Sequence, residues 1–211
     1  LYYVLFDLEP YLKDPIQIFN TRSGGLAIYG ALIAGGIWLY FFCRRNFISP
    51  VTFLDIAAPS VLLAQGIGRW GNFMNHEAHG AEVSRSFLES LHLPNFIIDN
   101  MNIDGAYRQP TFLYESVWNV LGFIVLVLLR KKKGLLKEGE VFLGYLIWYG
   151  FGRFFIEGMR TDSLYLFGPI RVSQVLSAVL FFGAIIVLIW RRKKTKVKDY
   201  NRSYGENEYV I

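Results

Sequence analysis

The sequence predicts an all-α integral membrane protein with about five to six transmembrane helices and a small head region outside the bilayer. Composition is the first observation: 53% of the 211 residues are hydrophobic and 18% are charged, whereas an average soluble domain carries about 25% charged residues. The second observation is that the apolar residues form several runs close to the ~20 residues that cross a bilayer core. The third is that basic residues cluster at the ends of these runs.

Four apolar runs are long enough to span a membrane. They are Gly24–Cys43, Phe112–Leu129, Gly139–Ile156 and Val172–Trp190. A fifth run, Val51–Ile67, is shorter and contains Pro59. Because proline kinks or breaks a helix, we expect this span to be tilted or broken. The chain also opens on an apolar stretch without an initiator methionine, so we expect at least one further span upstream of Leu1.

The basic clusters predict the orientation of the spans. They begin at Arg44, Arg130 and Arg191. Following the chain through its spans places all three on one side of the membrane, which the positive-inside rule assigns to the cytoplasm. The net charge of +5 is therefore juxtamembrane charge facing anionic lipid, and it does not indicate a nucleic-acid partner.

Residues 81–109 separate two spans and form an insertion on the outer side. They mix polar and apolar residues without a long period, and they contain Pro94. We expect a small exposed head with one short helix around Ser86–His92.

The first apolar run, Gly24–Cys43, is rich in small residues. Residues such as Gly30 and Ala34 permit close helix packing in lipid. Packing leaves Tyr29, which lies among them, unexplained.

The segment Gly68–Gly80 gathers polar residues at the outer end of a span. They are Arg69, Asn72, Asn75, Glu77 and the glycines around them. Polar groups at membrane depth must be satisfied, so they usually face a cavity and mark a site. Glycine lets the backbone approach a neighbour or a ligand closely. The segment therefore predicts a pocket for an anionic group.

Two further polar clusters fall in the outer half of the membrane. Glu115 and Asn119 are four residues apart near the start of a helix, and Tyr149, Arg153 and Glu157 recur every four residues on one helix face. The plain alternatives are an ordinary ion pair at Arg153–Glu157 and a helix N-terminal acid at Glu115. Two arginines on one side, each with a glutamate nearby, favour a shared site, because guanidinium groups suit phosphate.

The histidines present a metal alternative. His76 and His79 flank Glu77, and His92 could supply a third ligand. In the His-Glu-x-x-His zinc helix the two histidines are four residues apart, whereas here they are three apart. The spacing favours solvated loop histidines, and we expect neither a metal nor a cofactor.

These motifs resemble those of the phosphatidylglycerol–prolipoprotein diacylglyceryl transferase family, in particular its Gram-positive members. The resemblance rests on Gly68–Gly80 (Gly-Arg-x-Gly-Asn-Phe-x-Asn-x-Glu-x-x-Gly), Pro110–Glu115 (Pro-Thr-x-x-Tyr-Glu) and Arg153–Glu157. Weaker agreement occurs in Gly24–Gly36 and at Ser173-Gln174. It covers almost the whole chain, and the first motif is highly specific.

The resemblance implies a multi-pass enzyme of the bacterial plasma membrane with its active site toward the outer face. It implies transfer of the diacylglyceryl group of phosphatidylglycerol to the lipobox cysteine of a prolipoprotein signal peptide, with release of glycerol phosphate, in lipoprotein biosynthesis. Phosphatidylglycerol, the prolipoprotein and membrane lipids are then the partners, with no nucleic acid. We accordingly expect residues 1–192 to form a transmembrane catalytic domain with an extracellular head insertion at 81–109, and residues 193–211 a cytoplasmic basic tail with little structure.

By the same resemblance, Arg69 and Arg153 occupy positions associated with phospholipid binding and catalysis. The other catalytic candidates are Tyr29, Glu77 and Glu157, and the other substrate-binding candidates are Asn72, Asn75, Gly80 and Tyr149. The chain departs from many relatives at two positions, where Tyr29 and Gln109 replace histidine. The first departure leaves the identity of the general base open.

The chemistry implied by the resemblance accounts for the arginines. A thiolate that attacks a glycerol carbon expels a phosphate monoester, and preorganised guanidinium groups stabilise the charge that grows on its oxygens. The thiol, whose ordinary pKa is about 8.5, must lose its proton. The alternative is an anion or lipid transporter or channel with an arginine-lined outer cavity. The apolar inner halves of most spans speak against a channel, and the convergence of polar residues speaks against a non-catalytic scaffold.

Overall fold

The computed structural model describes residues 28–161, 165–167, 170–193 and 197–200. The chain divides into two compact units, Leu1–Phe53 and Leu54–Ile211. The described part of the first unit is helix α3 (Ile28–Arg45) with the connection to α4. Arg44 and Arg45 lie in the last turn of α3, where positive charge stabilises the helix dipole. The side chain of Asn46 donates to the carbonyl of Phe42 at 2.8 Å and closes this end.

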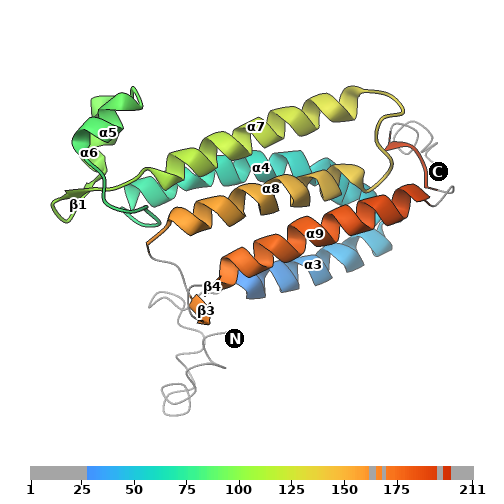
Figure 1. Cartoon of the computed structure of the whole chain (residues 1–211). Helices are drawn as coiled ribbons and strands as arrows, with labels where there is room; N and C mark the ends of the chain where they lie inside the picture. Colours follow the sequence, from blue (N-terminus) through green and yellow to red (C-terminus); the bar gives the residue numbers. More distant parts are fainter. Residues whose placement is uncertain (1–27, 162–164, 168–169, 194–196, 201–211) are drawn as a thin grey trace, which may run out of the picture. The chain divides into compact units, whose positions relative to one another are not determined.

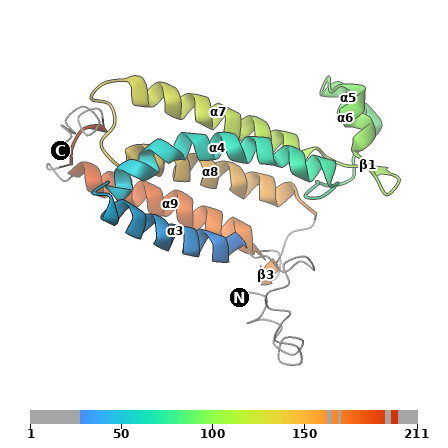
Figure 2. The same ribbon diagram turned by 180° about the vertical axis from the view of Figure 1, so that it is seen from behind.

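Helices α4 (Pro50–Met74), α7 (Thr111–Lys131), α8 (Glu140–Met159) and α9 (Val172–Lys193) make up most of the second unit. Figures 1 and 2 show α7 along α4 and α8, and α9 along the other side of α8. Helices α4 and α8 run in one direction and α7 and α9 in the other. One end of this bundle therefore holds the C-termini of α4 and α8 together with the N-terminus of α7.

Of the two alternatives predicted for α4, a broken helix is wrong, because Pro59 does not interrupt it. The helix runs unbroken over 25 residues and continues through Arg69 to Met74. Proline removes one backbone hydrogen bond, and membrane helices tolerate it where neighbouring helices surround it. Pro59 is buried here, as is Leu62 one turn further along. The polar residues at the end of α4 find partners on other helices, so they do not end it.

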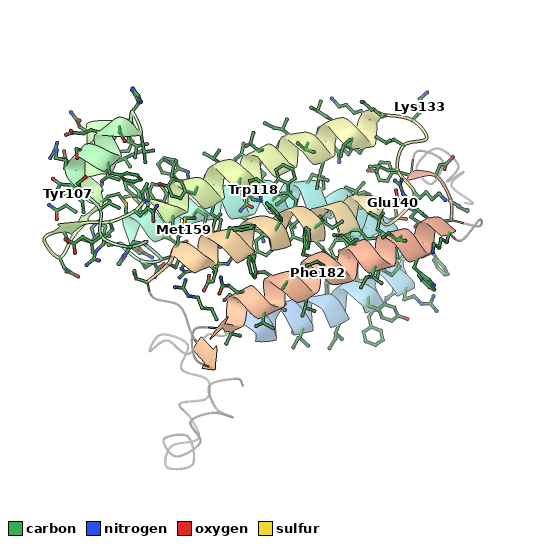
Figure 3. The ribbon with its side chains drawn as sticks, viewed as in Figure 1. Tyr107, Trp118, Lys133, Glu140, Met159 and Phe182 are labelled. Atoms are coloured by element: carbon green, nitrogen blue, oxygen red, sulfur yellow. The ribbon has the colours of Figure 1, made fainter. Side chains whose placement is uncertain are left out.

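Two tryptophans lock α7 to α8. Trp118 Nε1 donates to the carbonyl of Trp148 at 3.0 Å, and Trp148 Nε1 donates to the carbonyl of Trp118 at 2.9 Å. The two rings stack at 4.5 Å between centroids, and Figure 3 labels Trp118 between the two ribbons. Gly122 and Gly152 make room for these rings, since a Cβ at either position would meet an indole within 2.4 Å. Substitution of either glycine would separate the helices.

The opposite end of the bundle is held by charged groups. The carboxylate of Asp55, from α4, accepts hydrogen bonds from the backbone of Gly139 and Phe142 at the start of α8. Glu140 receives two hydrogen bonds from Arg192 of α9, each 2.8 Å long. Asp55 thus caps α8 from another helix, and Arg192 satisfies the buried acid in its first turn. The basic last turns of α7 and α9 lie at this same end of the bundle (Figure 1), as the sequence predicts for the clusters at Arg130 and Arg191.

The sequence predicts little structure after residue 193, and the described residues Lys198–Tyr200 differ from that prediction. Tyr200 N donates to the carbonyl of Leu136 at 2.9 Å, and Lys198 O accepts from Glu138 N at 3.0 Å. The Tyr200 side chain is buried among residues of α4, α7 and α8. The buried ring and the two backbone hydrogen bonds hold Lys198–Tyr200 against the residues that precede α8.

Three described helices are long and apolar enough to cross a membrane, namely α4, α7 and α9. The protein is an all-α membrane protein, as predicted, but the count of five to six spans is not confirmed in the described part of the chain. The runs predicted to start at Gly24 and Gly139 are helical as α3 and α8, apart from residues 24–27, which lie outside the described residues. Helix α8 carries Arg153 and Glu157, which reduce its hydropathy.

The insertion 81–109 forms a small folded head between the C-terminus of α4 and the N-terminus of α7. The predicted helix is α5 (Arg85–Ser90), and a second short helix, α6 (Asn95–Asn100), begins after Pro94. Strands β1 (Asn102–Ile103) and β2 (Ala106–Tyr107) form a hairpin. Apolar residues of α5 and α6 pack on Phe73 and Phe112, whose stacked rings are 4.5 Å apart. A second hairpin, β3 (Tyr165–Phe167) and β4 (Ile170–Arg171), precedes α9.

Candidate active site

Glu115 lies at the centre of the polar residues that the bundle brings together. It is in the second turn of α7 and is 3% exposed. Its Oε1 is 3.2 Å from Arg69 Nε, at the end of α4. Its Oε2 accepts a hydrogen bond of 2.9 Å from Arg153 on α8. One buried carboxylate therefore bridges two arginines from two other helices.

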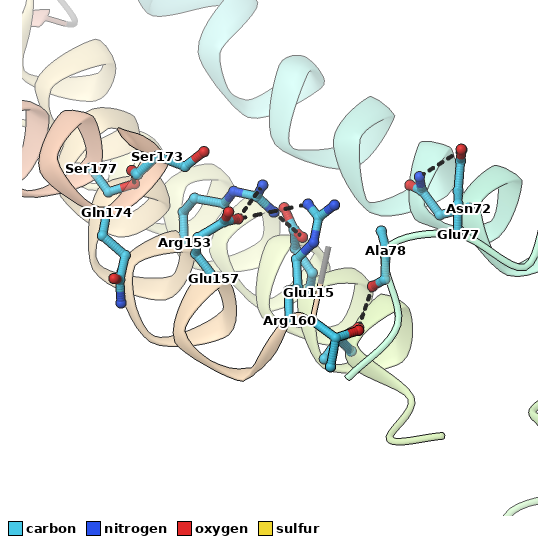
Figure 4. A network of polar contacts seen from close by, with 12 residues as sticks. Asn72, Glu77, Ala78, Glu115, Arg153, Glu157, Arg160, Ser173, Gln174 and Ser177 are labelled. Atoms are coloured by element: carbon cyan, nitrogen blue, oxygen red, sulfur yellow. Dashed lines mark hydrogen bonds and ion pairs between the residues drawn. The ribbon is translucent and has the colours of Figure 1, made fainter. Parts of the chain in front are cut away.

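A second carboxylate extends this arrangement along α8. Arg153 contacts Glu157 Oε2 at 2.6 Å, and the same oxygen is 3.6 Å from Arg160. Figure 4 shows Arg153 between Glu115 and Glu157, with Arg160 beside them. We call these residues the arginine–carboxylate cluster: Arg69, Glu115, Arg153, Glu157 and Arg160. Three guanidinium groups contact two carboxylates, so the cluster carries one excess positive charge.

The exposure of its members shows what the cluster can bind. The carboxylate side chains are 4% and 2% exposed, whereas Arg69, Arg160 and Arg153 are 22%, 15% and 12% exposed. Within the described part of the chain, the Arg69–Glu115 contact is an ion pair without an aligned hydrogen bond at Arg69 Nε. The three guanidinium groups are nevertheless partly exposed, and partly exposed arginines suit an incoming oxyanion such as a phosphate.

Amide side chains continue the network from Arg69 into the following loop. Arg69 donates to Asn72 Oδ1 at 3.3 Å, and Asn72 Nδ2 donates to Glu77 Oε1 at 3.0 Å. Asn75 Nδ2 lies 3.4 Å from the same Glu77 oxygen. Figure 4 shows the pair formed by Asn72 and Glu77. Four residues that the sequence singles out in one motif therefore form one hydrogen-bonded chain.

The loop after α4 is held tightly against α7 and α8. His76 and Ala78 adopt φ of 55° and 58°, which is rare for residues other than glycine. Thr111 Oγ1 donates to the carbonyl of Ala78, and Thr161 N donates to the carbonyl of His79 at 3.2 Å. These contacts satisfy the turned backbone and fix the loop to the start of α7 and the end of α8.

Gly80 has a steric role in this loop. It forms a β-bridge with Arg160, and its N–H donates to the carbonyl of Gln109 at 3.0 Å. A Cβ at Gly80 would lie 2.8 Å from the Cβ of Gln109 and 3.1 Å from Thr111. Gly80 thus allows the loop, the start of α7 and Arg160 to meet.

Two other predicted site residues are Tyr149 and Tyr29. Tyr149 is one turn before Arg153 on α8, where it is within electrostatic range of Arg153 and Glu115 and stacks on Tyr145 at 5.9 Å between centroids. Tyr29 belongs to α3 in the first unit, and its side chain lies outside the described residues. Its proposed catalytic role is therefore untested.

The histidines of the first motif contact polar neighbours in the head and at the end of α8. His76 Nε2 is 3.4 Å from Asn100 Oδ1, and His79 Nδ1 is 3.3 Å from Thr161 Oγ1. Gln109 contacts the hydroxyl of Tyr114 through its side chain. These contacts stabilise the loop and the start of α7.

Sequence reasoning did not name Glu115 and Arg160 among the site residues. Its plain alternative for Glu115, an ordinary helix N-terminal acid, does not describe the residue, because Glu115 lies in the second turn of α7 and pairs with two arginines. A carboxylate buried in a membrane helix needs a cationic partner, and this rule could have identified Glu115. Arg160 follows Glu157 at i,i+3, which is also a visible pairing distance.

Apolar helices that enclose arginines and carboxylates at one end define a helical membrane protein with a site suited to an anion. The family described as prolipoprotein diacylglyceryl transferase matches residues 1–190 of the chain. The phosphatidylglycerol–prolipoprotein diacylglyceryl transferase of Enterococcus faecalis is 71% identical over 202 residues, which are 96% of this chain and 73% of that protein. Proteins of the same name from Pediococcus pentosaceus and Lactiplantibacillus plantarum are 61% and 60% identical over 95% and 90% of this chain, and over 72% and 68% of their own lengths.

The chain belongs to the prolipoprotein diacylglyceryl transferase family. It is a membrane transferase, as the sequence motifs predict. The alternative of an anion or lipid transporter is not supported, since these relatives carry the transferase name.

Proposed function

We propose that this protein transfers the diacylglyceryl group of phosphatidylglycerol to the cysteine thiol of a prolipoprotein lipobox and releases glycerol phosphate. The names of its relatives state the lipid and the prolipoprotein for those proteins. The observation that carries the proposal for this chain is Glu115, which holds Arg69 and Arg153 together at 3.2 and 2.9 Å. Two arginines fixed by one buried acid offer a rigid receptor for a phosphate.

The reaction forms one bond and breaks another. The thiolate sulfur attacks the glyceryl carbon that carries the phosphate, the carbon–sulfur bond forms, and the carbon–oxygen bond to the phosphate breaks. The electron pair of that bond remains on the leaving glycerol phosphate. Arg69, Arg153 and Arg160 stabilise this charge, and they need little reorganisation because Glu115 and Glu157 already orient them.

A base must take the proton of the thiol, and Glu77 is better placed for this role than Glu157. Glu157 is 2% exposed and lies against two guanidinium groups. Glu77 is exposed in the loop after α4, where Asn72 and Asn75 donate to it. A peptide thiol approaching from the head could reach Glu77, and Asn72 would link that proton transfer to the phosphate held at Arg69.

The orientation of the protein follows from its two ends. Basic residues gather where α7 and α9 end, and the arginine–carboxylate cluster lies at the other end of the same helices. From the positive-inside rule we infer that the cluster and the head face outward from the plasma membrane. This is the side on which a translocated lipobox would arrive.

The experiment uses the purified protein with phosphatidylglycerol vesicles and a lipobox peptide. We expect release of glycerol phosphate and a peptide mass increase equal to one diacylglyceryl group, both dependent on the peptide cysteine. A peptide with serine in place of that cysteine is the control. Glycerol phosphate release without peptide would indicate a phospholipase, and would contradict the proposal.

A further inference from the structure

A second layer of polar residues lies one helical turn inside the arginine–carboxylate cluster. Gln65 precedes Arg69 by four residues on α4, and Asn119 follows Glu115 by four residues on α7. Both steps lead away from the head, and four residues advance an α-helix by about 6 Å. The two amides therefore lie deeper in the bundle than the charged groups, on the same helix faces.

The third helix repeats this spacing. On α8, Tyr149 and then Tyr145 follow Arg153 inward at intervals of four residues. The hydroxyl of Tyr145 accepts a hydrogen bond from Gln65 Nε2 at 3.1 Å. All three helices that supply the charged cluster thus also supply uncharged polar groups below it.

Asn119 has hydrogen-bonding groups that the described residues do not satisfy. It is 1% exposed, and neither its Nδ2 nor its Oδ1 has a partner in the part of the chain that the structure describes. Gln65 Oε1 is also buried without a hydrogen-bond partner among the described residues. A buried amide without a partner destabilises a protein, because it has lost its hydrogen bonds to water. An unpaired amide in that position points to a ligand that the protein binds there.

The packing around Asn119 keeps its side chain in place. Gly66 of α4 faces it, and a Cβ at Gly66 would lie 3.5 Å from the Asn119 Cβ and 3.3 Å from the Ser116 carbonyl. On the same turn of α7, Ser116 Oγ accepts from Trp70 Nε1 at 3.2 Å. The amide is thus presented from a rigid contact between two helices.

We propose that Asn119 binds an ester carbonyl of the diacylglyceryl group, with its Nδ2 as the donor. The inference rests on the proposed function, because it takes the phosphate of the same lipid to occupy the arginines. The glyceryl esters are the uncharged polar groups of a phospholipid, and they lie a few covalent bonds inward from its phosphate. An uncharged N–H donor one turn below the arginines matches both their position and their chemistry.

The test compares two donor lipids on the wild-type protein and on Asn119→Leu. One is ordinary diester phosphatidylglycerol, and the other is its dialkyl ether analogue, which keeps the phosphate and the reacting carbon but lacks the carbonyls. For wild type we expect kcat/KM to be about fivefold to tenfold lower with the ether lipid, the size of one neutral hydrogen bond. Asn119→Leu should lose a similar factor on the diester lipid and little on the ether lipid.

The two proteins and the two lipids form a double-mutant cycle. The quantity that decides the result is the loss of kcat/KM caused by Asn119→Leu on the diester lipid compared with the loss on the ether lipid, because differences in the physical behaviour of the two lipids cancel in this comparison. Equal losses on both lipids would overturn the proposal and leave Asn119 a packing or water-binding residue. If Asn119→Leu does not fold, equal kcat/KM of wild type on both lipids would overturn it as well. Ser177→Ala is the matched control, since this buried hydroxyl bonds the Ser173 carbonyl of its own helix. Absence of any transfer by wild type from the diester lipid would contradict the proposed function instead.

Discussion

Replacing Glu115 with glutamine removes the negative charge that joins Arg69 and Arg153 and leaves the shape of the side chain almost unchanged. The excess positive charge of the cluster would rise from one to two. Removing one partner of a buried ion pair destabilises a protein by about 3–5 kcal/mol. The arginines here are 22% and 12% exposed, so we take the lower value of about 3 kcal/mol, to allow for solvent screening.

The two expected readouts are thermal stability and turnover. For a protein of this size each kcal/mol shifts the Tm by about 2–4 °C, so Glu115→Gln should unfold about 6–12 °C lower in detergent. Misplacing a charged group by about 1 Å can reduce a rate by about 10²-fold, and we expect kcat to fall on that order. Below the new Tm, the variant should still bind phosphatidylglycerol, because the guanidinium groups remain.

Glu89→Gln is the matched control for this substitution. Glu89 receives a hydrogen bond of 2.9 Å from Arg85 on the exposed surface of the head, and its side chain is 54% exposed. The same chemical change there should leave the Tm and kcat near their wild-type values, because exposed pairs contribute little. If Glu115→Gln behaved like Glu89→Gln in both assays, the bridging role of Glu115 would be refuted.

Three other predictions follow from the same contacts and use the peptide assay. Arg69→Lys and Arg153→Lys should each lose most activity at equal membrane abundance, because lysine cannot form the planar two-point contact, and near-normal turnover would remove that residue from the site. Gly80→Ala should reduce both stability and activity, because its Cβ would lie 2.8 Å from Gln109. Gly71→Ala, which has open space around it, should change neither. Equal stability and equal activity of the two variants would contradict the steric argument. Tyr29→Phe should reduce transition-state stabilisation by about 1–2 kcal/mol without abolishing turnover, and Tyr29→His should be tolerated. If Tyr29→Phe is folded but inactive at every pH, the hydroxyl is essential and this prediction is wrong.

The length of apolar runs predicts the helices of the bundle well, because a bilayer core requires both a minimum length and internal hydrogen bonding. Helix α7 spans Thr111–Lys131 against a predicted run of Phe112–Leu129, and α9 agrees as closely. The same reasoning failed at α4, where it gave Pro59 too much weight. Whether a proline ends a membrane helix depends on the neighbours that surround it, and these are not visible in a single run of sequence.

The head shows a second limit of sequence patterns. Its two helices have six residues each, which is too short for an apolar period to be recognised. Helix α6 begins directly after Pro94, and proline is favourable at a helix start, but the sequence analysis noted Pro94 without predicting a helix after it. The head also gains its stability from Phe73 and Phe112, which lie outside the insertion. A local pattern could not show that dependence.

In the candidate site, contacts within one helix could be predicted from the sequence, whereas contacts between helices could not. The spacing of Arg153 and Glu157 shows in the sequence that they share a face, and their ion pair is 2.6 Å long. The bridge from Glu115 to Arg69 joins residues 46 positions apart, so it requires the direction and register of α4 and α7. Charge balance supplies the missing signal, because each arginine buried in a membrane bundle requires a carboxylate or a ligand. In this chain the arginines of the cluster outnumber its carboxylates by one. That remaining charge is what an anionic lipid would neutralise, so the same imbalance that destabilises the empty bundle would favour binding of phosphatidylglycerol.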